Sequence, residues 1–247
     1  MKLLAFETST EACSVALWLD GEVRERFELA PRRHAELSLP WAEQLLAEAG
    51  VKRRELDAVA LGRGPGAFTG VRLAIALAQG VALALDVPAI PVSTLAVLAL
   101  RARPLAAGAG PQRVLSAIDA RMGEVYTAAF ELRDGEPLAL DREAVLAPDA
   151  AQLPADGAPD DGTPDNGWLG VGTGFAAADG ALRQRLGARF AAIDADALPH
   201  AADLARLAAA AYARGESIAP ERIEPAYLRN NVALTIAEQA ALRARAS

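Results

Sequence analysis

The sequence contains almost no cysteine or histidine. Its 247 residues include one cysteine, Cys13, and two histidines, His34 and His200. A single cysteine excludes an internal disulfide framework and is typical of a reducing compartment, so we expect a cytoplasmic protein. A metal site built on imidazoles requires that they converge, whereas these two histidines begin two separate predicted helices. We therefore expect neither a metal ion nor another cofactor.

Common catalytic motifs are also missing. No HExxH, GxSxG or CxxC pattern occurs, which leaves the simplest protease, esterase and redox interpretations without support. Asp119, Arg121 and Glu124 form a local group of charges in a predicted strand connection. Such charges either act as an acid/base set or are simply solvated or paired. The residues alone show no complete catalytic constellation.

Positive charge is in deficit. The chain has 25 Lys and Arg against 32 Asp and Glu, a formal net charge of −7. Phosphate backbones bind clustered Lys and Arg, so we expect contact with nucleic acid only through a partner. The N-terminus opens directly into a predicted strand, without the basic and apolar regions of an export signal.

A glycine-rich stretch, Gly62 to Gly70, joins an apolar strand to a long apolar helix. Glycine permits positive φ and close backbone approach, and proline fixes one φ, so the turn has a fixed shape. Glycines before a helix can also present N–H groups to phosphate. The last glycine is followed by Val-Arg, however, and not by the Lys-Ser/Thr pair of a P-loop, and the spacing misses the dinucleotide pattern. We favour a structural role for Gly64, Pro65, Gly66 and Gly70.

The helix that follows is almost free of polar residues. The 13 residues from Leu73 to Leu85 are too few to span a bilayer comfortably, and a helix that is apolar all round must be covered on most sides. Small residues form one ridge at i+4 spacing, with a second ridge beside it. Such ridges let another helix approach closely, and that helix belongs either to this domain or to a second protein. The first ridge is Gly70, Ala74, Ala78 and Ala82, and the second is Ala76, Gly80 and Ala84.

The order of predicted elements indicates an α/β protein with two similar halves. In the first half, strands are expected at 2–7, 13–19, 22–28, 57–62 and 89–92, and helices within 31–50 and at 73–85. Pro40 is expected in or near the first turn of the earlier helix. This order, βββαβα and then β, is typical of a ribonuclease-H-like domain with a mixed sheet.

The second half repeats this general order. Strands are expected at 114–118, 124–130, within 136–146, at 168–171 and at 189–193, with helices at 176–186 and 201–214. We place an N-terminal domain at 1–103 and a second ribonuclease-H-like domain at 112–221, in which we expect a mobile loop rich in Pro, Asp and Gly at 148–167. We expect residues 222–247 to form an extended tail that ends in a helix at 235–245.

Four stretches together resemble the TsaB family, also called YeaZ. They are Phe6–Thr10, Gly64–Arg72, Asp119–Arg121 with Glu124–Tyr126, and Pro225–Arg229. The resemblance covers nearly the whole chain. It implies the actin/hexokinase-like (ASKHA) fold and a non-catalytic subunit that works with TsaD and the ATPase TsaE. The product is threonylcarbamoyladenosine in tRNAs that read codons beginning with A.

The resemblance also implies partners. These are TsaD in a heterodimer, TsaE, a second copy in a homodimer when TsaD is absent, and tRNA only through the complex, with no membrane. In the family the first two helices form a bundle with TsaD or the second copy. By motif match, the interface residues are Leu37, Trp41, Leu45, Phe68, Val71, Arg72, Ala74, Ile75, Ala78 and Gln79. TsaD carries a His-x-x-x-His metal motif where residues 92–98 of this chain have no histidine, which implies no catalysis by this chain alone.

The chain departs from the family pattern at two places, and two alternative functions remain open. Glu7 stands where many members have Asp, and the 148–167 loop is longer than usual. A small-molecule kinase or ATPase is the first alternative, because the fold is bilobal and the Thr8 and Ser9 hydroxyls could be vestigial phosphate contacts, although turn chemistry is favoured for them. A metallopeptidase is the second, disfavoured because the sequence offers no metal-ligand motif.

Overall fold

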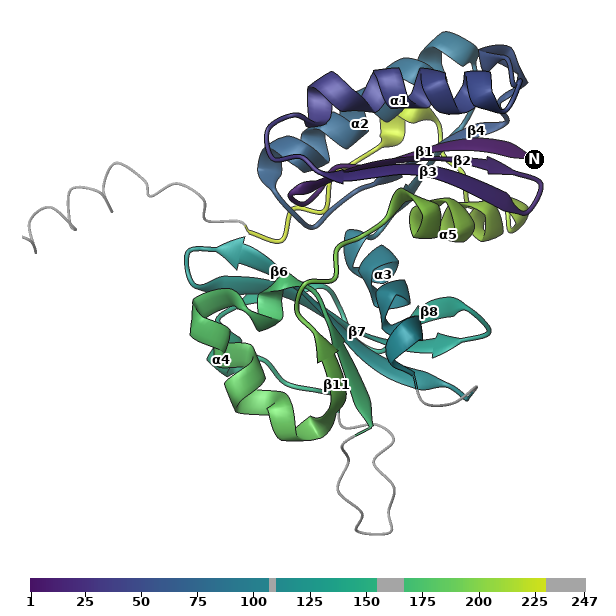
Figure 1. The fold of residues 1–247 in the computed structure, drawn as a ribbon. Coiled ribbons are helices and arrows are strands. Elements are labelled where there is room, and N and C mark those ends of the chain that lie inside the picture. The colour runs from purple at the N-terminus through teal and green to yellow at the C-terminus, as the bar shows by residue number, and fades with distance from the viewer. Residues whose placement is uncertain (107–109, 155–166, 230–247) are drawn as a thin grey trace, which may run out of the picture.

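The N-terminal lobe is built on a five-stranded mixed sheet. The computed structural model describes residues 1–106, 110–154 and 167–229, which form two lobes (Figure 1). In the first sheet the strand order is β3-β2-β1-β4-β5. Strand β2 is antiparallel to β1 and β3, and β4 is parallel to β1 and β5. The strands are β1 (Lys2–Glu7), β2 (Ala12–Leu19), β3 (Glu22–Leu29), β4 (Ala58–Gly62) and β5 (Ala89–Val92).

The second lobe repeats this topology. Its sheet has the order β8-β7-β6-β10-β11, in which β7 is antiparallel to β6 and β8 while β10 is parallel to β6 and β11. The two ribonuclease-H-like sheets of an ASKHA protein are thereby confirmed. The strands are β6 (Gln112–Arg121), β7 (Glu124–Arg133), β8 (Glu136–Ala139), β10 (Trp168–Val171) and β11 (Phe190–Asp194), and the short β9 (Ala144–Leu146) also pairs with β7.

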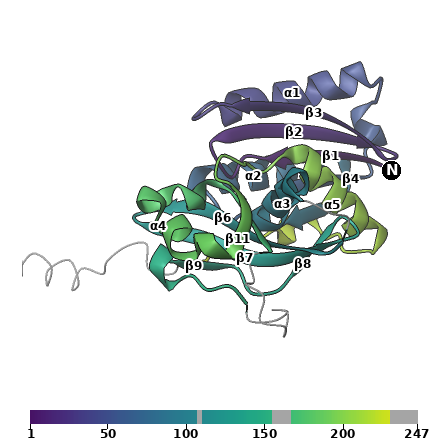
Figure 2. The same cartoon turned by 60° about the horizontal axis from the view of Figure 1, so that its bottom comes forward.

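In the described part of the chain, five α-helices cover the faces of the sheets. Helices α1 (His34–Glu48) and α2 (Phe68–Leu85) lie on the outer face of the first sheet, and α5 (Ala201–Ala213) covers its inner face. Helix α3 (Thr94–Ala99) covers the inner face of the second sheet and α4 (Ala177–Leu186) its outer face. The order of layers is visible in Figure 1, and Figure 2 shows α3 beside α5 between the sheets.

Strand β1 shows how the sequence produces these layers. Successive side chains on a strand point to opposite faces, so a strand buried on both sides needs apolar residues throughout. Leu4 and Phe6 pack in the cluster formed with α1 and α2. Leu3 and Ala5 pack in the cluster formed with α5. All four are at most 2% exposed, so β1 lies at the centre of the lobe.

The two inner helices cross between the lobes. Helix α3 lies within 1–103 but packs on the second sheet through Leu95 and Leu98, whereas α5 lies within 112–221 but packs on the first sheet through Leu204 and Ala208. Each sheet has two apolar faces, and its second cover comes from a distant part of the chain. Each sheet is therefore covered in part by a helix from the other half of the sequence.

Three details differ from the sequence expectations. Helix α1 begins at His34, so Pro40 is in its second turn; Pro40 and Glu36 are both exposed, and water can replace the missing backbone hydrogen bond. Helix α3 was not expected. Helix α2 begins at Phe68 and has 18 residues rather than 13. Most of the 148–167 loop and the expected 235–245 helix lie outside the described residues.

Candidate functional site

The glycine-rich loop packs against the turn between β1 and β2. A Cβ atom on Gly66 would lie 2.4 Å from the Ser9 carbonyl oxygen, and one on Gly70 would lie 2.0 Å from the Thr8 carbonyl oxygen. The Ala67 N–H donates to the Ser9 carbonyl at 2.7 Å. The close backbone approach that the glycines permit is thus made by the protein's own chain. The loop is thereby held against the turn.

The hydroxyls of this turn are used internally. Thr8 and Ser9 are fully buried. The Thr8 hydroxyl donates to the Gly70 carbonyl at 2.7 Å, and the Thr94 hydroxyl donates to Ser9 Oγ at 3.1 Å. These bonds tie the turn to α2 and to the start of α3. In this arrangement neither side chain is presented to a phosphate.

Glu7 is a buried acid beneath the same turn. The Ser9 N–H donates to its Oε1 at 2.8 Å, and the Thr94 hydroxyl oxygen lies 3.4 Å from its Oε2. A Cβ atom on Gly62 would meet this carboxyl group at 2.0 Å, so the glycine makes room for it. Burial raises the pKa of Glu7 above its ordinary value, and the hydrogen bonds offset only part of that effect.

A groove of about 760 Å³ lies between the lobes next to this turn. It is lined by the four motif regions that carry the family resemblance, together with the start of α1. The lining segments are Ser9–Glu11, Pro31 and Arg32 before α1, His34 and Ala35 in α1, Gly66–Leu73, Ile118–Met122, Tyr126, and Pro225–Arg229. Stretches far apart in the sequence therefore meet at one site.

The chain after α5 runs along the N-terminal lobe to reach this groove. We call residues 218–229 the tail strap. Ile218 exchanges two backbone hydrogen bonds of 2.9 Å with Ala89 of β5, and the Gln79 side chain donates to the Pro220 carbonyl at 3.1 Å. The side chain of Ile223 is buried in the core cluster that α1 and α2 form. The strap is thereby fixed along α2.

At its far end the tail strap reaches the second lobe. The Ala226 N–H donates to the Arg63 carbonyl at 2.9 Å. The Arg229 guanidinium donates to the Ala120 carbonyl at 3.2 Å and forms an ion pair with Glu124. The nearby Asp119 pairs with Arg121 at 2.8 Å. The acids and bases of the Asp119–Glu124 connection are therefore paired with one another and with the strap.

Arg72 stands at the rim of the groove between two aromatic rings. Its guanidinium lies 3.8 Å from the ring centroid of Phe68 and 5.8 Å from that of Tyr227. The Tyr227 hydroxyl accepts hydrogen bonds from Nε at 3.1 Å and from Nη2 at 2.8 Å. Phe68 is 60% exposed and Tyr227 is 55% exposed. The tail strap thus fixes an arginine of α2 in an exposed, stacked position.

The residues expected at a partner interface fall into three groups. Leu45, Val71, Ala74, Ile75 and Ala78 are buried in the lobe's own core, and Leu37, Trp41 and Gln79 are half-buried. Phe68 and Arg72 are exposed. The first small-residue ridge therefore packs within the lobe, where Ala74, Ala78 and Ala82 have no exposed surface. We call these three residues the inner ridge.

The second ridge of α2 faces solvent. Ala76, Gly80 and Ala84, which we call the outer ridge, are exposed, and Leu83 beside them is 53% exposed. By length and composition α2 is also the one described helix apolar enough to cross a membrane, although a third of it is buried. The argument that this helix is too short to span a bilayer does not hold, because α2 has 18 residues rather than 13. The contacts of the inner ridge oppose a bilayer crossing instead, because a crossing would strip that ridge from its sheet.

The two histidines are engaged in separate places. His34 Nε2 lies 3.0 Å from the Thr10 carbonyl and 3.1 Å from the Ala12 carbonyl, which joins α1 to the β1–β2 turn. His200 contacts Glu25 at 2.9 Å and stacks on Phe27. Within residues 1–106, 110–154 and 167–229, no three His, Cys, Asp or Glu side chains are grouped to hold a metal ion.

Comparison with known proteins connects this site to a family. A sequence model of the family described as TsaD, tRNA N6-adenosine threonylcarbamoyltransferase, matches residues 28–237. The tRNA threonylcarbamoyladenosine biosynthesis protein TsaB of Escherichia coli K12 is 42% identical over 94% of this chain and 96% of its own length. The TsaB of Haemophilus influenzae is 38% identical over 94% and 95%.

The chain belongs to the TsaB (YeaZ) family.

A solved TsaB-family structure supports the same fold. YeaZ from Pseudomonas aeruginosa matches with 46% identity and a TM-score of 0.78 over 92% of this chain and 99% of that one. A second structure from that organism, described as similar to peptidase YEAZ, matches with 47% identity and a TM-score of 0.81 over the same shares. As the name of its members states, the TsaB family takes part in the biosynthesis of threonylcarbamoyladenosine in tRNA.

Sequence reasoning found the TsaB motifs but not how they meet. Pro225–Arg229 was recognised as a motif without a structural role, and the structure makes it the part of the strap that contacts both lobes. Arg32 and Met122 were not singled out, yet both line the groove, and Met122 is 84% exposed. Arg32 has a φ of 70° just before α1, a conformation that no local pattern indicated.

Proposed function

We propose that this chain is a non-catalytic partner subunit that works with TsaD and TsaE to form threonylcarbamoyladenosine in tRNAs reading codons that begin with A. The observation that carries the proposal is the exposed outer ridge of α2. Its neighbours Phe68 and Leu83 are also exposed, so an apolar surface runs along the helix. Exposed apolar surface of this kind marks a protein interface.

The small side chains of the outer ridge suit a helical partner. Ala76, Gly80 and Ala84 let the backbone of another helix approach closely. In our proposal that helix belongs to TsaD, or to a second copy of this chain when TsaD is absent. Half-buried Leu37 and Trp41 of α1 would flank the contact. The chain acts in the cytoplasm, away from membranes, and meets tRNA only through the complex.

The kinase or ATPase alternative receives less support. A phosphate loop must present free backbone N–H groups. Here the Ser9 carbonyl accepts the Ala67 N–H, and the backbone of Thr8 and Ser9 packs against Gly66 and Gly70. Calorimetry with ATP and Mg²⁺ separates the two functions: a kinase binds at micromolar concentration, whereas we expect no heat of binding from the isolated chain. The metallopeptidase alternative has no candidate ligand set among the described residues.

Ala76→Glu tests the proposed function. It places a carboxylate on the outer ridge, so we expect the variant to fold as the wild type does but to lose co-purification with the TsaD of the same organism. Ala213→Glu is the matched control, because Ala213 is an exposed alanine at the end of α5. It should retain the partner. Unchanged TsaD binding by folded Ala76→Glu would contradict the proposal.

A further inference from the structure

The rim of the groove carries positive charge that the chain does not neutralise. Four arginines line the groove, Arg32, Arg72, Arg121 and Arg229, against the two carboxylates of Glu11 and Asp119. Arg121 and Arg229 are paired with Asp119 and Glu124. Within the described ranges, no ion pair involves Arg32 or Arg72. A local excess of arginine is unexpected in a chain with a net charge of −7.

Arg72 is held in a geometry that suits a carboxylate. One face of its guanidinium stacks on Phe68, and Tyr227 occupies the Nε edge with two hydrogen bonds. Among the described residues, none accepts a hydrogen bond from Nη1 or from the second hydrogen of Nη2, so these hydrogens can bind a ligand. A planar guanidinium binds a carboxylate through paired N–H groups, and stacking on an aromatic ring restricts its rotamers in advance.

We propose that Arg72, fixed by Phe68 and Tyr227, binds an Asp or Glu side chain of TsaD, the partner that covers α2 in our proposed function. This inference rests on the proposed function and specifies the chemistry of the partner. Arginine and aromatic residues dominate the binding energy of protein interfaces, and exposed Met122 adds apolar surface at the same rim. Tyr227 is then a positioning residue, which acts through the orientation of Arg72.

A protein carboxylate fits the surroundings better than an RNA phosphate does. The exposed surface that continues from Arg72 along α2 is the uncharged outer ridge with Leu83. An RNA-binding surface would need further Lys or Arg along this path, because phosphates are spaced regularly along the strand. The outer ridge instead continues the contact as an apolar protein interface.

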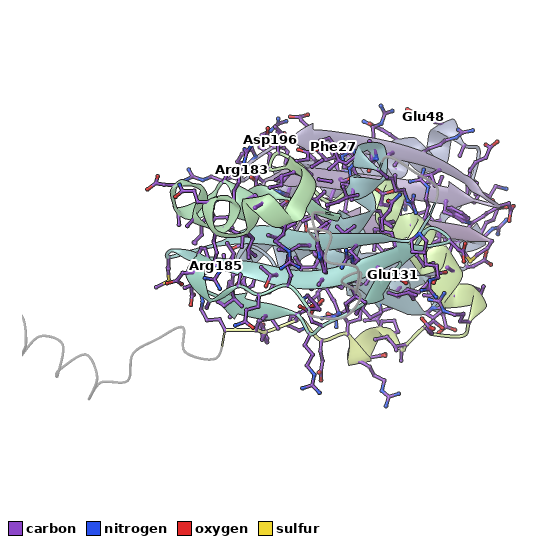
Figure 3. All side chains as sticks on the ribbon, turned by 90° about the horizontal axis from the view of Figure 1, so that it is seen from below. Phe27, Glu48, Glu131, Arg183, Arg185 and Asp196 are labelled. Atoms are coloured by element: carbon purple, nitrogen blue, oxygen red, sulfur yellow. The ribbon has the colours of Figure 1, made fainter. Side chains whose placement is uncertain are left out.

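The experiment measures the affinity of the purified chain for the TsaD of its own organism at 50 and 500 mM NaCl. We expect Arg72→Gln to weaken binding about 10-fold or more at low salt and to reduce the salt dependence. Arg72→Lys, which keeps the charge but not the planar stack, should fall between Arg72→Gln and the wild type. Tyr227→Phe should weaken TsaD binding about threefold, because the Arg72 side chain loses the hydroxyl that fixes its rotamer. Arg183→Gln on α4, labelled in Figure 3, is the charge-matched control and should bind as the wild type does.

The outcomes separate the two proposals. If the wild-type chain does not bind TsaD, the proposed function fails and this inference fails with it. If the wild type binds but Arg72→Gln binds equally well with the same salt dependence, only the carboxylate assignment is overturned. It is also overturned if Arg72→Gln weakens tRNA binding by the assembled complex and leaves the affinity between the proteins unchanged. Circular dichroism melts of each variant verify the fold.

Discussion

The two lobes share one strand order but differ in their outer layers. On the N-terminal lobe, α2 presents Phe68, Leu83 and the uncharged outer ridge to solvent. On the second lobe, α4 presents charged residues, among them Arg183 and Arg185 (Figure 3). The second lobe shows that this topology does not require an apolar outer surface. This contrast supports the proposed contact of α2 with another protein.

The first hairpins of the two lobes differ in how deeply their acidic residues are buried. Glu7, at the end of β1, is buried beneath the glycine-rich loop. Asp119, near the end of β6, is partly exposed and pairs with Arg121. Both lobes nevertheless bring glycines against the first strand or its turn: Cβ atoms on Gly172 and Gly174 would lie within 3 Å of Ala117. The lobes thus share a backbone arrangement and differ in the polar groups placed on it.

The largest effect is expected where α2 meets its own sheet. Ala78→Glu should lower the free energy of unfolding by roughly 3–5 kcal/mol, because it buries an unpaired charge at a position with no exposed surface. Urea denaturation measures the loss. Ala76→Glu on the outer ridge should change stability by less than about 0.5 kcal/mol. Equal stabilities of the two variants would contradict the division of α2 into inner and outer ridges.

A pair of glycines in α2 tests the same division through the backbone. Gly70→Ala should cost about 1–3 kcal/mol, because its Cβ would overlap the Thr8 carbonyl oxygen. Gly80→Ala should instead stabilise by about 0.5–1 kcal/mol, since alanine favours the helix and nothing lies within 4 Å of the added atom. Thermal melts compare the two. Gly174→Ala should resemble Gly70→Ala if the lobes share this close approach, and a neutral result there would show that they do not.

The smallest effects are expected from the acids of the two first hairpins, Glu7 and Asp119, and they are compared through the pH dependence of stability. Because burial raises the pKa of Glu7, the folded state holds a proton that the unfolded state has already lost over part of the pH range. The stability linked to Glu7 is thus fully present below its unfolded pKa and is lost as pH rises through the folded pKa. Glu7→Gln keeps hydrogen-bonding atoms without the charge, so its stability relative to the wild type should increase with pH.

Urea titrations between pH 4 and 8 measure this difference. Asp119→Asn is the matched change in the second lobe. It disrupts a partly exposed ion pair and should cost less than about 1 kcal/mol. A Glu7→Gln stability difference that stays constant with pH would show that the buried carboxyl keeps the same charge in both folded and unfolded states over this range.

Periodicity and turn chemistry predicted most of the fold. The strands expected at 2–7 and 22–28 and the long apolar run after Gly70 located their elements to within a few residues. Helix α3 was missed although its N-cap signal was present: the Ser93 hydroxyl accepts the Ala96 N–H at 3.2 Å. A six-residue helix gives too little periodicity to stand out.

The site was harder to predict than the fold, because it depends on contacts between distant residues. The sequence shows both ridges of α2, but which ridge faces the sheet depends on the angle at which the helix leaves Gly66 and Gly70. That angle is set by Thr8 and Ser9. The position of Arg72 likewise depends on Tyr227, which lies 155 residues further along the chain. No local pattern contains this information.

The crossing of α5 onto the first sheet has a consequence during protein synthesis. Strand β5 leaves the ribosome long before α5, and 121 residues of translation separate Val92 from Ala213. At common elongation rates this interval is roughly 6–24 s. For that time the nascent sheet exposes Leu3, Ala58 and Ile90, which α5 later buries. A chaperone that shields this face until α5 emerges would protect the newborn chain from aggregation.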